Sequence, residues 1–140
     1  MSAKENREVV RREVALWNGH DAEAFGEVYA ENYLGHDPAG THAGSLEQLK
    51  QSAAAVFSAF PDFSLTLDDV IVEEEMAAKR WTARGTHTGE WMGIPATGKA
   101  IVTTGNNLFR IVDGKIAECW AQSDALGLMQ QLGVLPPMGG

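Results

Sequence analysis

Residues 101–133 constrain the fold more than any other segment, because two runs of strand character meet at Asp113-Gly114 and a short helical run follows them. Asp-Gly between alternating apolar runs favours a type I′ turn, in which both central residues need a positive φ. The segment therefore predicts a β-hairpin of strands 101–112 and 115–123, followed by a helix over about 125–132.

Alternation along the two strands divides their side chains between two faces. One face is predicted to carry Thr103, Gly105, Asn107, Phe109, Ile111, Ala117, Cys119 and Ala121. The other is predicted to carry Val102, Thr104, Leu108, Arg110, Ile116, Glu118 and Trp120. Polar residues on the first face are candidates for chemistry if that face points inward. Large apolar residues on the second face, Leu108, Ile116 and Trp120, indicate that a second subunit covers it, so we expect a homodimer or tetramer.

Three helices are predicted before the strands. Ser2-Ala-Lys-Glu5 and Ser45-Leu-Glu-Gln48 have the form of capping boxes, and the first helix should end near Asn18-Gly19. Asp21 can cap a second helix between them. The buried stripe of that second helix is predicted to be Phe25, Val28 and Tyr29. The third helix is predicted from the helical spacing of Leu46, Leu49, Ala53, Val56, Phe57 and Phe60.

Strand patterns fill the rest of the chain. Strands are predicted at 63–73 and 77–88 before the hairpin, a short extended segment at 33–37, and a loop at 89–98. Helices followed by sequential antiparallel strands are typical of an α+β protein. We therefore expect one domain over 1–140. Three N-terminal helices would pack on a curved, mainly antiparallel sheet as a cone with a pocket between the layers, and residues 136–140 would form a flexible tail.

Charge and composition exclude several classes of protein. The net charge of −8 argues against a nucleic-acid partner, because such proteins concentrate Lys and Arg. No run of about 18 apolar residues is present, which argues against a membrane span. The single cysteine, Cys119, cannot form an internal disulfide and fits a reducing compartment. With no apolar stretch near the N-terminus to act as a signal peptide, we expect a cytoplasmic protein.

A series of short motifs points to a family. The motifs are Asn32-Tyr33-Leu34, Phe60-Pro61-Asp62, Gly85-Thr-His-Thr-Gly89, Gly93-Ile-Pro95, Phe109-Arg110, Asp113-Gly-Lys-Ile116, Glu118-Cys-Trp120, Asp124 and Gln131-Leu-Gly133. Because these motifs occur in this order, the chain resembles the SnoaL-like polyketide cyclase (ester cyclase) family. This family belongs to the nuclear-transport-factor-2-like superfamily and has a cystatin-like α+β cone. The resemblance covers about residues 9–133. It implies a deep apolar pocket, a dimer or tetramer, no metal or organic cofactor, and ring closure by an intramolecular aldol reaction.

Two positions depart from the pattern of the family. The resemblance implies an acid/base aspartate one residue after Trp120 and a histidine just before Leu108-Phe109-Arg110. The residues at these positions are Ala121 and Asn107. Alanine cannot transfer a proton, so any chemistry must use other residues.

Asp124, His36 and Asn107 are the candidate catalytic residues. Asp124 precedes the terminal helix, where its carboxylate could be a general base or a helix N-cap. His36 follows the second predicted helix and could be a base or a hydrogen-bonded structural residue. Asn107 could donate a hydrogen bond to a carbonyl or enolate oxygen, or satisfy neighbouring polar groups.

The other candidates concern ligand contacts and metals. Residues expected to line a substrate site are Trp17, Tyr33, Phe60, Trp81, His87, Trp91 and Cys119. No base accompanies Cys119 in the sequence, which argues against a nucleophilic role. His42 is predicted to anchor a loop, and His20 to follow a helix C-terminus. The spacing of His36, Asp37 and His42 matches no standard ligand pattern, so no metal site is predicted.

Two hypotheses follow for the function. In the first, the chain is a cofactor-independent cyclase or isomerase that abstracts a proton next to a carbonyl of a hydrophobic small molecule. In the second, it is a non-catalytic, ligand-binding or oligomeric member of the fold, because Ala121 replaces the acid/base aspartate.

Overall fold

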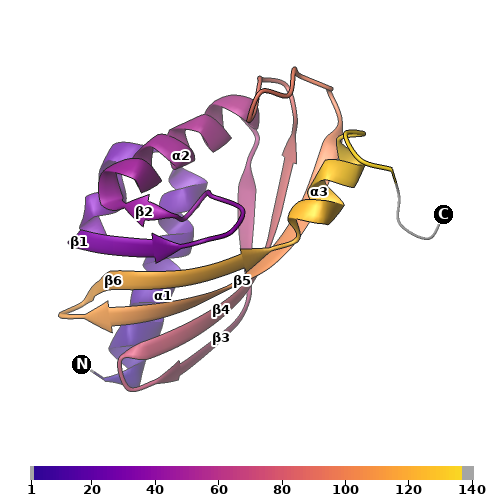
Figure 1. The fold of residues 1–140 in the computed structure, drawn as a ribbon. Coiled ribbons are helices and arrows are strands. Elements are labelled where there is room, and N and C mark those ends of the chain that lie inside the picture. The colour runs from indigo at the N-terminus through magenta and orange to yellow at the C-terminus, as the bar shows by residue number, and fades with distance from the viewer. Residues whose placement is uncertain (1, 137–140) are drawn as a thin grey trace.

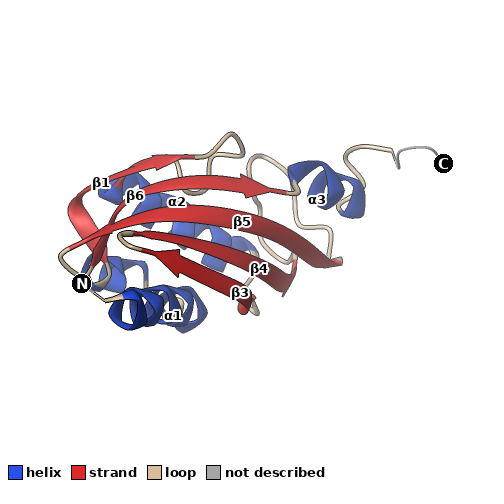
Figure 2. Cartoon of the chain, turned by 90° about the horizontal axis from the view of Figure 1, so that it is seen from below, coloured by secondary structure: helices blue, strands red, loops and turns tan. Residues whose placement is uncertain are grey.

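The computed structural model describes residues 2–136. The elements, in chain order, are α1 (Ala3–Gly19), the 3₁₀ helix η1 (Ala22–Glu27), β1 (Tyr29–His36), β2 (Gly44–Ser45), α2 (Leu46–Ala59), β3 (Ser64–Glu73), β4 (Met76–Thr86), β5 (Ala100–Val112), β6 (Lys115–Ser123) and α3 (Ala125–Gln131). Two views show α1 and α2 on one side of a curved sheet (Figures 1 and 2). Of the predicted tail at 136–140, all but the first residue lies outside the described residues.

One six-stranded sheet runs in the order β2-β1-β6-β5-β4-β3. Strands β3 to β6 pair in sequence and antiparallel, as the turn signals predict. β1 pairs with β6 in parallel, and β2 pairs with β1. The α+β layout with N-terminal helices and a mainly antiparallel sheet is therefore confirmed. The parallel pair matters most for the site, because it carries the end of β1 into the interior beside β6.

The local signals that start and end elements are mostly confirmed. Both capping boxes form, with Ser2 and Ser45 as N-caps of α1 and α2. Asp113 and Gly114 have φ values of 50° and 79°, as a type I′ turn requires. α1 ends at Gly19, as predicted, and the residue after it, His20, takes the left-handed conformation with φ 57°.

Two local predictions are wrong. The second helix is a 3₁₀ helix that ends at Glu27, and Tyr29 begins β1 instead of continuing the helix. Tyr29 is drawn into the core, where its hydroxyl donates a hydrogen bond of 2.6 Å to Glu13. Ile116 is fully buried rather than on the outer face, because the β5–β6 register shifts after Arg110 and pairs Ile111 with Ile116.

A buried ion pair ties α1 to the sheet. Lys79 on β4 donates to Glu13 on α1 over 2.7 Å, and the two side chains are 1% and 0% exposed. The other oxygen of Glu13 accepts from Tyr29, whose hydroxyl in turn accepts a 3.3 Å bond from the Trp17 indole. Burial, followed by the charge of Glu13, raises the pKa of Tyr29 well above its usual value, so its hydroxyl remains a donor.

Among the described residues, no helix is long and apolar enough to cross a membrane.

We predict that Glu13→Gln lowers the free energy of unfolding by about 3–5 kcal/mol, because it leaves the Lys79 ammonium buried without its counter-charge. Chemical denaturation measures the difference. Glu8→Gln is the matched control, because Glu8 is on the same helix but 61% exposed, and it should cost less than about 1 kcal/mol. An equally small loss for Glu13→Gln would contradict this view of the core.

Candidate functional site

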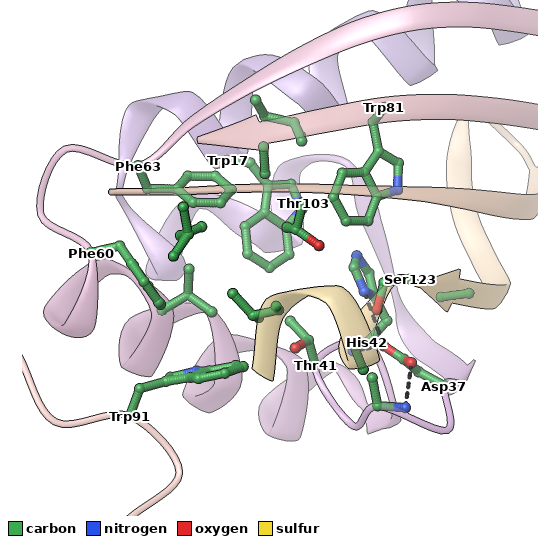
Figure 3. A pocket seen from close by; sticks show the side chains of 18 of the residues that line it. Trp17, Asp37, Thr41, His42, Phe60, Phe63, Trp81, Trp91, Thr103 and Ser123 are labelled. Carbon is green, nitrogen blue, oxygen red and sulfur yellow. Dashed lines mark hydrogen bonds and ion pairs between the residues drawn. The ribbon is translucent and has the colours of Figure 1, made fainter. Parts of the chain in front are cut away.

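A cavity of about 280 Å³ lies between the helices and the inner face of the sheet (Figure 3). It is close to the lower end of the size range of small-molecule sites, roughly 300–1,000 Å³. Its walls are mainly apolar and aromatic. The polar or charged side chains among its lining residues are Asp37, Thr41, His42, Lys79, Thr103 and Ser123.

Small residues keep this part of the interior open. Ala83 and Ala121 line the cavity from β4 and β6. On β5, Gly105 lies beneath Trp81, and a Cβ there would collide with the indole ring. The indole N–H of Trp81 donates to Asn107 over 2.5 Å, which fixes the ring over the glycine. One face of the indole is thereby held as a wall of the cavity.

Asp37 and His42 form an imidazole–carboxylate pair among the lining residues of the cavity. His42 Nδ1 lies 3.3 Å from Asp37 Oδ2, and the two side chains are 11% and 3% exposed. The same carboxylate oxygen accepts the backbone N–H of His42 over 2.9 Å, and the other accepts the backbone N–H of Ala39 over 2.9 Å. One carboxylate thus shapes the loop from 37 to 42 and orients the imidazole that the loop carries (Figure 3).

The backbone of His42 is also held by contacts with β1. Its carbonyl oxygen accepts a 2.8 Å hydrogen bond from the buried Tyr33 hydroxyl. The same carbonyl passes so close to Gly35 that any side chain there would collide with it. Because both residues belong to β1, the strand itself sets the position of His42.

The protonation of the pair follows from its contacts. Burial acts to raise the pKa of Asp37, but the hydrogen bonds from the His42 ring, from the His42 backbone and from Ala39 outweigh it, so the pKa lies below its usual value. An ionised carboxylate only accepts hydrogen bonds, so in the neutral ring the proton of His42 is on Nδ1. No hydrogen bond within residues 2–136 involves Nε2. This leaves a basic nitrogen on a residue that lines the cavity.

The structure places the predicted base Asp124 outside the cavity lining. Asp124 is exposed and caps α3, with Oδ1 accepting the Gly127 N–H over 2.9 Å. This is the N-cap arrangement that the sequence left open as an alternative.

His36, the second predicted base, lies on the outer face of the sheet. Its Nε2 is 2.7 Å from Glu118, its side chain is 44% exposed, and its ring stacks on Trp120. His36 and Asp37 point to opposite faces because they are adjacent at the end of a strand. The structure therefore separates His36 from Asp37 and His42. Among the described residues, no three His, Cys, Asp or Glu side chains gather as a metal site would require.

Asn107 and Cys119 are buried and are not lining residues of the cavity. The Asn107 amide is occupied on both sides, because it accepts from Trp81 and donates to Cys119 Sγ over 3.4 Å. Burial raises the pKa of Cys119 to about 12, so its thiol remains protonated. Both residues support Trp81 instead of facing a ligand.

The predicted ligand contacts divide into two groups. Trp17, Phe60, Trp81 and Trp91 line the cavity, whereas Tyr33 and His87 do not. Tyr33 supports His42, and His87 is buried beside Phe60, where its Nδ1 is 3.0 Å from the Thr97 hydroxyl.

Sequence reasoning missed the pairing of Asp37 with His42. The alternation along β1 carries the signal, because Tyr33 and Gly35 face inward and Asp37 is the next residue in that series. The position of His42 could not be read this way, since it depends on the loop after the strand.

Comparisons with known proteins show the family of the chain. Residues 7–132 match the family model described as SnoaL-like polyketide cyclase. The chain is 32% identical over 130 residues to the aklanonic acid methyl ester cyclases DauD of Streptomyces sp. (strain C5) and DnrD of Streptomyces peucetius. These matches cover 90% of this chain and 80% and 89% of the relatives.

Solved structures show the same fold. AclR from Streptomyces galilaeus, described as a proposed hydroxylase, superposes with a TM-score of 0.87 at 28% identity, covering 97% of this chain and 89% of AclR. TsrD from Streptomyces laurentii superposes with a TM-score of 0.86 at 30% identity, covering 96% of this chain and 99% of TsrD.

We predict that Asp37→Asn lowers the free energy of unfolding at pH 7 by roughly 1–3 kcal/mol, because a neutral amide replaces an ionised acceptor of several hydrogen bonds. The low pKa of Asp37 contributes stability that is fully present above about pH 4 and is lost as the pH falls through the folded-state value. The difference between wild type and variant should therefore shrink between pH 7 and about pH 3, measured by urea unfolding.

Asp124→Asn is the control for this series, since asparagine caps helices as well as aspartate does. If the difference in the free energy of unfolding between the wild type and Asp37→Asn stays constant as the pH falls, these hydrogen bonds do not stabilise the ionised Asp37 carboxylate.

Proposed function

Because the chain belongs to the SnoaL-like polyketide cyclase family, we propose that it cyclises or isomerises a hydrophobic carbonyl compound, with His42 as the general base. The observation that carries the proposal is the Asp37–His42 pair on the wall of an apolar cavity. An imidazole held in one tautomer by a carboxylate is a suitable general base for taking a proton from carbon.

The proposed reaction has two proton transfers. His42 Nε2 takes a proton from the carbon next to a carbonyl, and the electron pair of the C–H bond forms an enolate. The enolate carbon then bonds to a second carbonyl carbon of the same molecule, and the new alkoxide receives the proton back from His42. Asp37 stabilises the imidazolium between the two transfers and keeps the ring in position.

This assignment accounts for Ala121. His36 pairs with Trp120 in the parallel β1–β6 ladder, so Asp37 follows at the level of Ala121. Both residues line the cavity. We propose that Asp37 and His42 supply, from β1 and its loop, the carboxylate and imidazole that the family resemblance places at 121 and 107. Asp124, His36 and Asn107 then have structural roles.

The second candidate function is binding of a hydrophobic small molecule without chemistry. It is favoured by the other contacts of Asp37, whose carboxylate also accepts the backbone N–H groups that shape the loop. A pair that only organises the loop would leave a binding protein whose cavity has five aromatic lining residues, Trp17, Phe60, Phe63, Trp81 and Trp91. Substitution of His42 distinguishes the two.

We predict that His42→Gln lowers kcat/KM for cyclisation of aklanonic acid methyl ester, the compound named for the relatives, by at least about 100-fold, since the base contributes roughly 10²–10⁴. Substrate loss and product formation are followed by chromatography. His36→Gln is the matched control and should retain activity, because His36 is on the outer face. Activity that survives in His42→Gln and is lost in His36→Gln would reverse the assignment.

We also propose that a second copy of the chain covers the outer face of the sheet. Leu34, Val102, Leu108 and Trp120 are 39–47% exposed there, on three adjacent strands. Exposed apolar side chains gathered on one sheet face are typical of an interface.

We predict that Trp120→Glu converts a dimer into a monomer in size-exclusion chromatography with light scattering, because it places a carboxylate in the apolar interface. Leu126→Glu, on α3 and 46% exposed in the described structure, should leave the mass unchanged. A wild-type protein that is monomeric at high micromolar concentration would contradict the proposal.

A further inference from the structure

Thr103 carries a buried hydroxyl that has no hydrogen-bond partner within residues 2–136. Within residues 2–136 three enclosed side-chain atoms have no hydrogen-bond partner: Asn6 Oδ1, His87 Nε2 and Thr103 Oγ1. Thr103 is the one of these three residues that lines the cavity. A buried hydroxyl without a partner is unfavourable, so its presence needs an explanation.

The surroundings of Thr103 explain why the protein itself does not satisfy the hydroxyl. On one side its neighbour is Ala83 of β4, which has no polar side-chain atom. On the other side β6 ends at Ser123, which pairs with Gly105, and the Asp124 N–H then bonds to the Thr104 carbonyl as the chain turns into α3. Thr103 therefore lines the cavity at a level of the sheet that β6 no longer reaches.

The direction of the hydroxyl agrees with a ligand contact. Figure 3 shows the Thr103 oxygen on the side of the cavity where Trp81 and His42 lie. The indole N–H of Trp81 is already bonded to Asn107, so Trp81 contributes an apolar ring face and no donor. Around this part of the cavity, Thr103 can offer a ligand one donor and one acceptor.

We propose that Thr103 is a specificity-determining residue whose hydroxyl hydrogen-bonds a hydroxyl or carbonyl oxygen of the molecule in the cavity. The inference rests on the proposed function in taking this cavity as the substrate site. It adds that the ligand contains a ring that lies against the Trp81 indole, and that this ring carries the oxygen. Holding that oxygen fixes how the ring is turned relative to His42, so Thr103 selects among ligands of equal size.

The test compares 2-naphthol with naphthalene, two probes that differ by one hydroxyl, in titrations followed by tryptophan fluorescence. In the wild type 2-naphthol should bind more tightly. In Thr103→Val, which keeps the shape and removes the hydroxyl, the ratio of the two dissociation constants should fall about tenfold. Thr103→Ser should keep most of the preference. Thr104→Val, on the same strand but on the exposed outer face, should keep all of it.

The Tm of Thr103→Val gives a second test, because the substitution that weakens ligand discrimination should not weaken the fold. Without ligand, Thr103→Val should leave Tm unchanged or raise it, since no protein group within residues 2–136 bonds to the hydroxyl that it removes. A fall in Tm of several degrees would show that the hydroxyl has a partner within the protein. Either that fall or an unchanged naphthol-to-naphthalene ratio in Thr103→Val would overturn the inference.

These readouts are independent of turnover. If His42→Gln remained active, the proposed function would fail while the effect of Thr103→Val on the probes would stand. If His42→Gln were inactive and the probe ratio of Thr103→Val matched the wild type, only the role of Thr103 would fail.

Discussion

The buried ion pair between Glu13 and Lys79 is the constraint on which the interior depends. Two buried charges are tolerated only when they pair in good geometry, so the ion pair restricts how α1 packs on β4. Tyr29 and Trp17 extend the same network to β1 and to the wall of the cavity. The aromatic walls on the helix side and the sheet side are thus fixed relative to each other by polar contacts beneath them.

Above this layer, residues with small side chains or none leave the space that forms the cavity. Gly105 lets Trp81 lie flat on β5, and Gly35 lets the His42 carbonyl cross β1. Ala121 contributes no acid, and its short side chain leaves room beside Asp37. The result is a mainly apolar cavity whose lining includes one imidazole–carboxylate pair, Asp37 and His42, held in a fixed position by the loop that carries it.

Most of the fold could be predicted from local signals in the sequence. The Asp113-Gly114 turn and the two capping boxes are encoded by neighbouring residues, and the structure has them where they were predicted. The 3₁₀ helix and the inward position of Ile116 could not be predicted, because a distant carboxylate attracts Tyr29 and a bulge shifts the register.

The site was predicted less completely than the fold. Four aromatic lining residues were identified, since large aromatics in an α+β cone are good candidates for pocket walls. The Asp37–His42 pair and the unpaired Thr103 hydroxyl were not identified. The position of Asp37 depends on the parallel pairing of β1 with β6, in which His36 pairs with Trp120 from the far end of the chain. The surroundings of Thr103 depend on where β6 ends relative to β5. Asp124 and His36 were favoured because their residue types suit catalysis, which says nothing of the face they occupy.

The most direct test of the central claim is the tautomer of the neutral His42 ring, measured by nitrogen-15 NMR of the imidazole. We predict that in the neutral ring the proton is on Nδ1 and not on Nε2, because Asp37 accepts from Nδ1. Substitution of Asp37 by asparagine should change this tautomer balance. A ring protonated at Nε2 in the wild type would leave no basic nitrogen in the cavity and would contradict the assignment of His42 as the base.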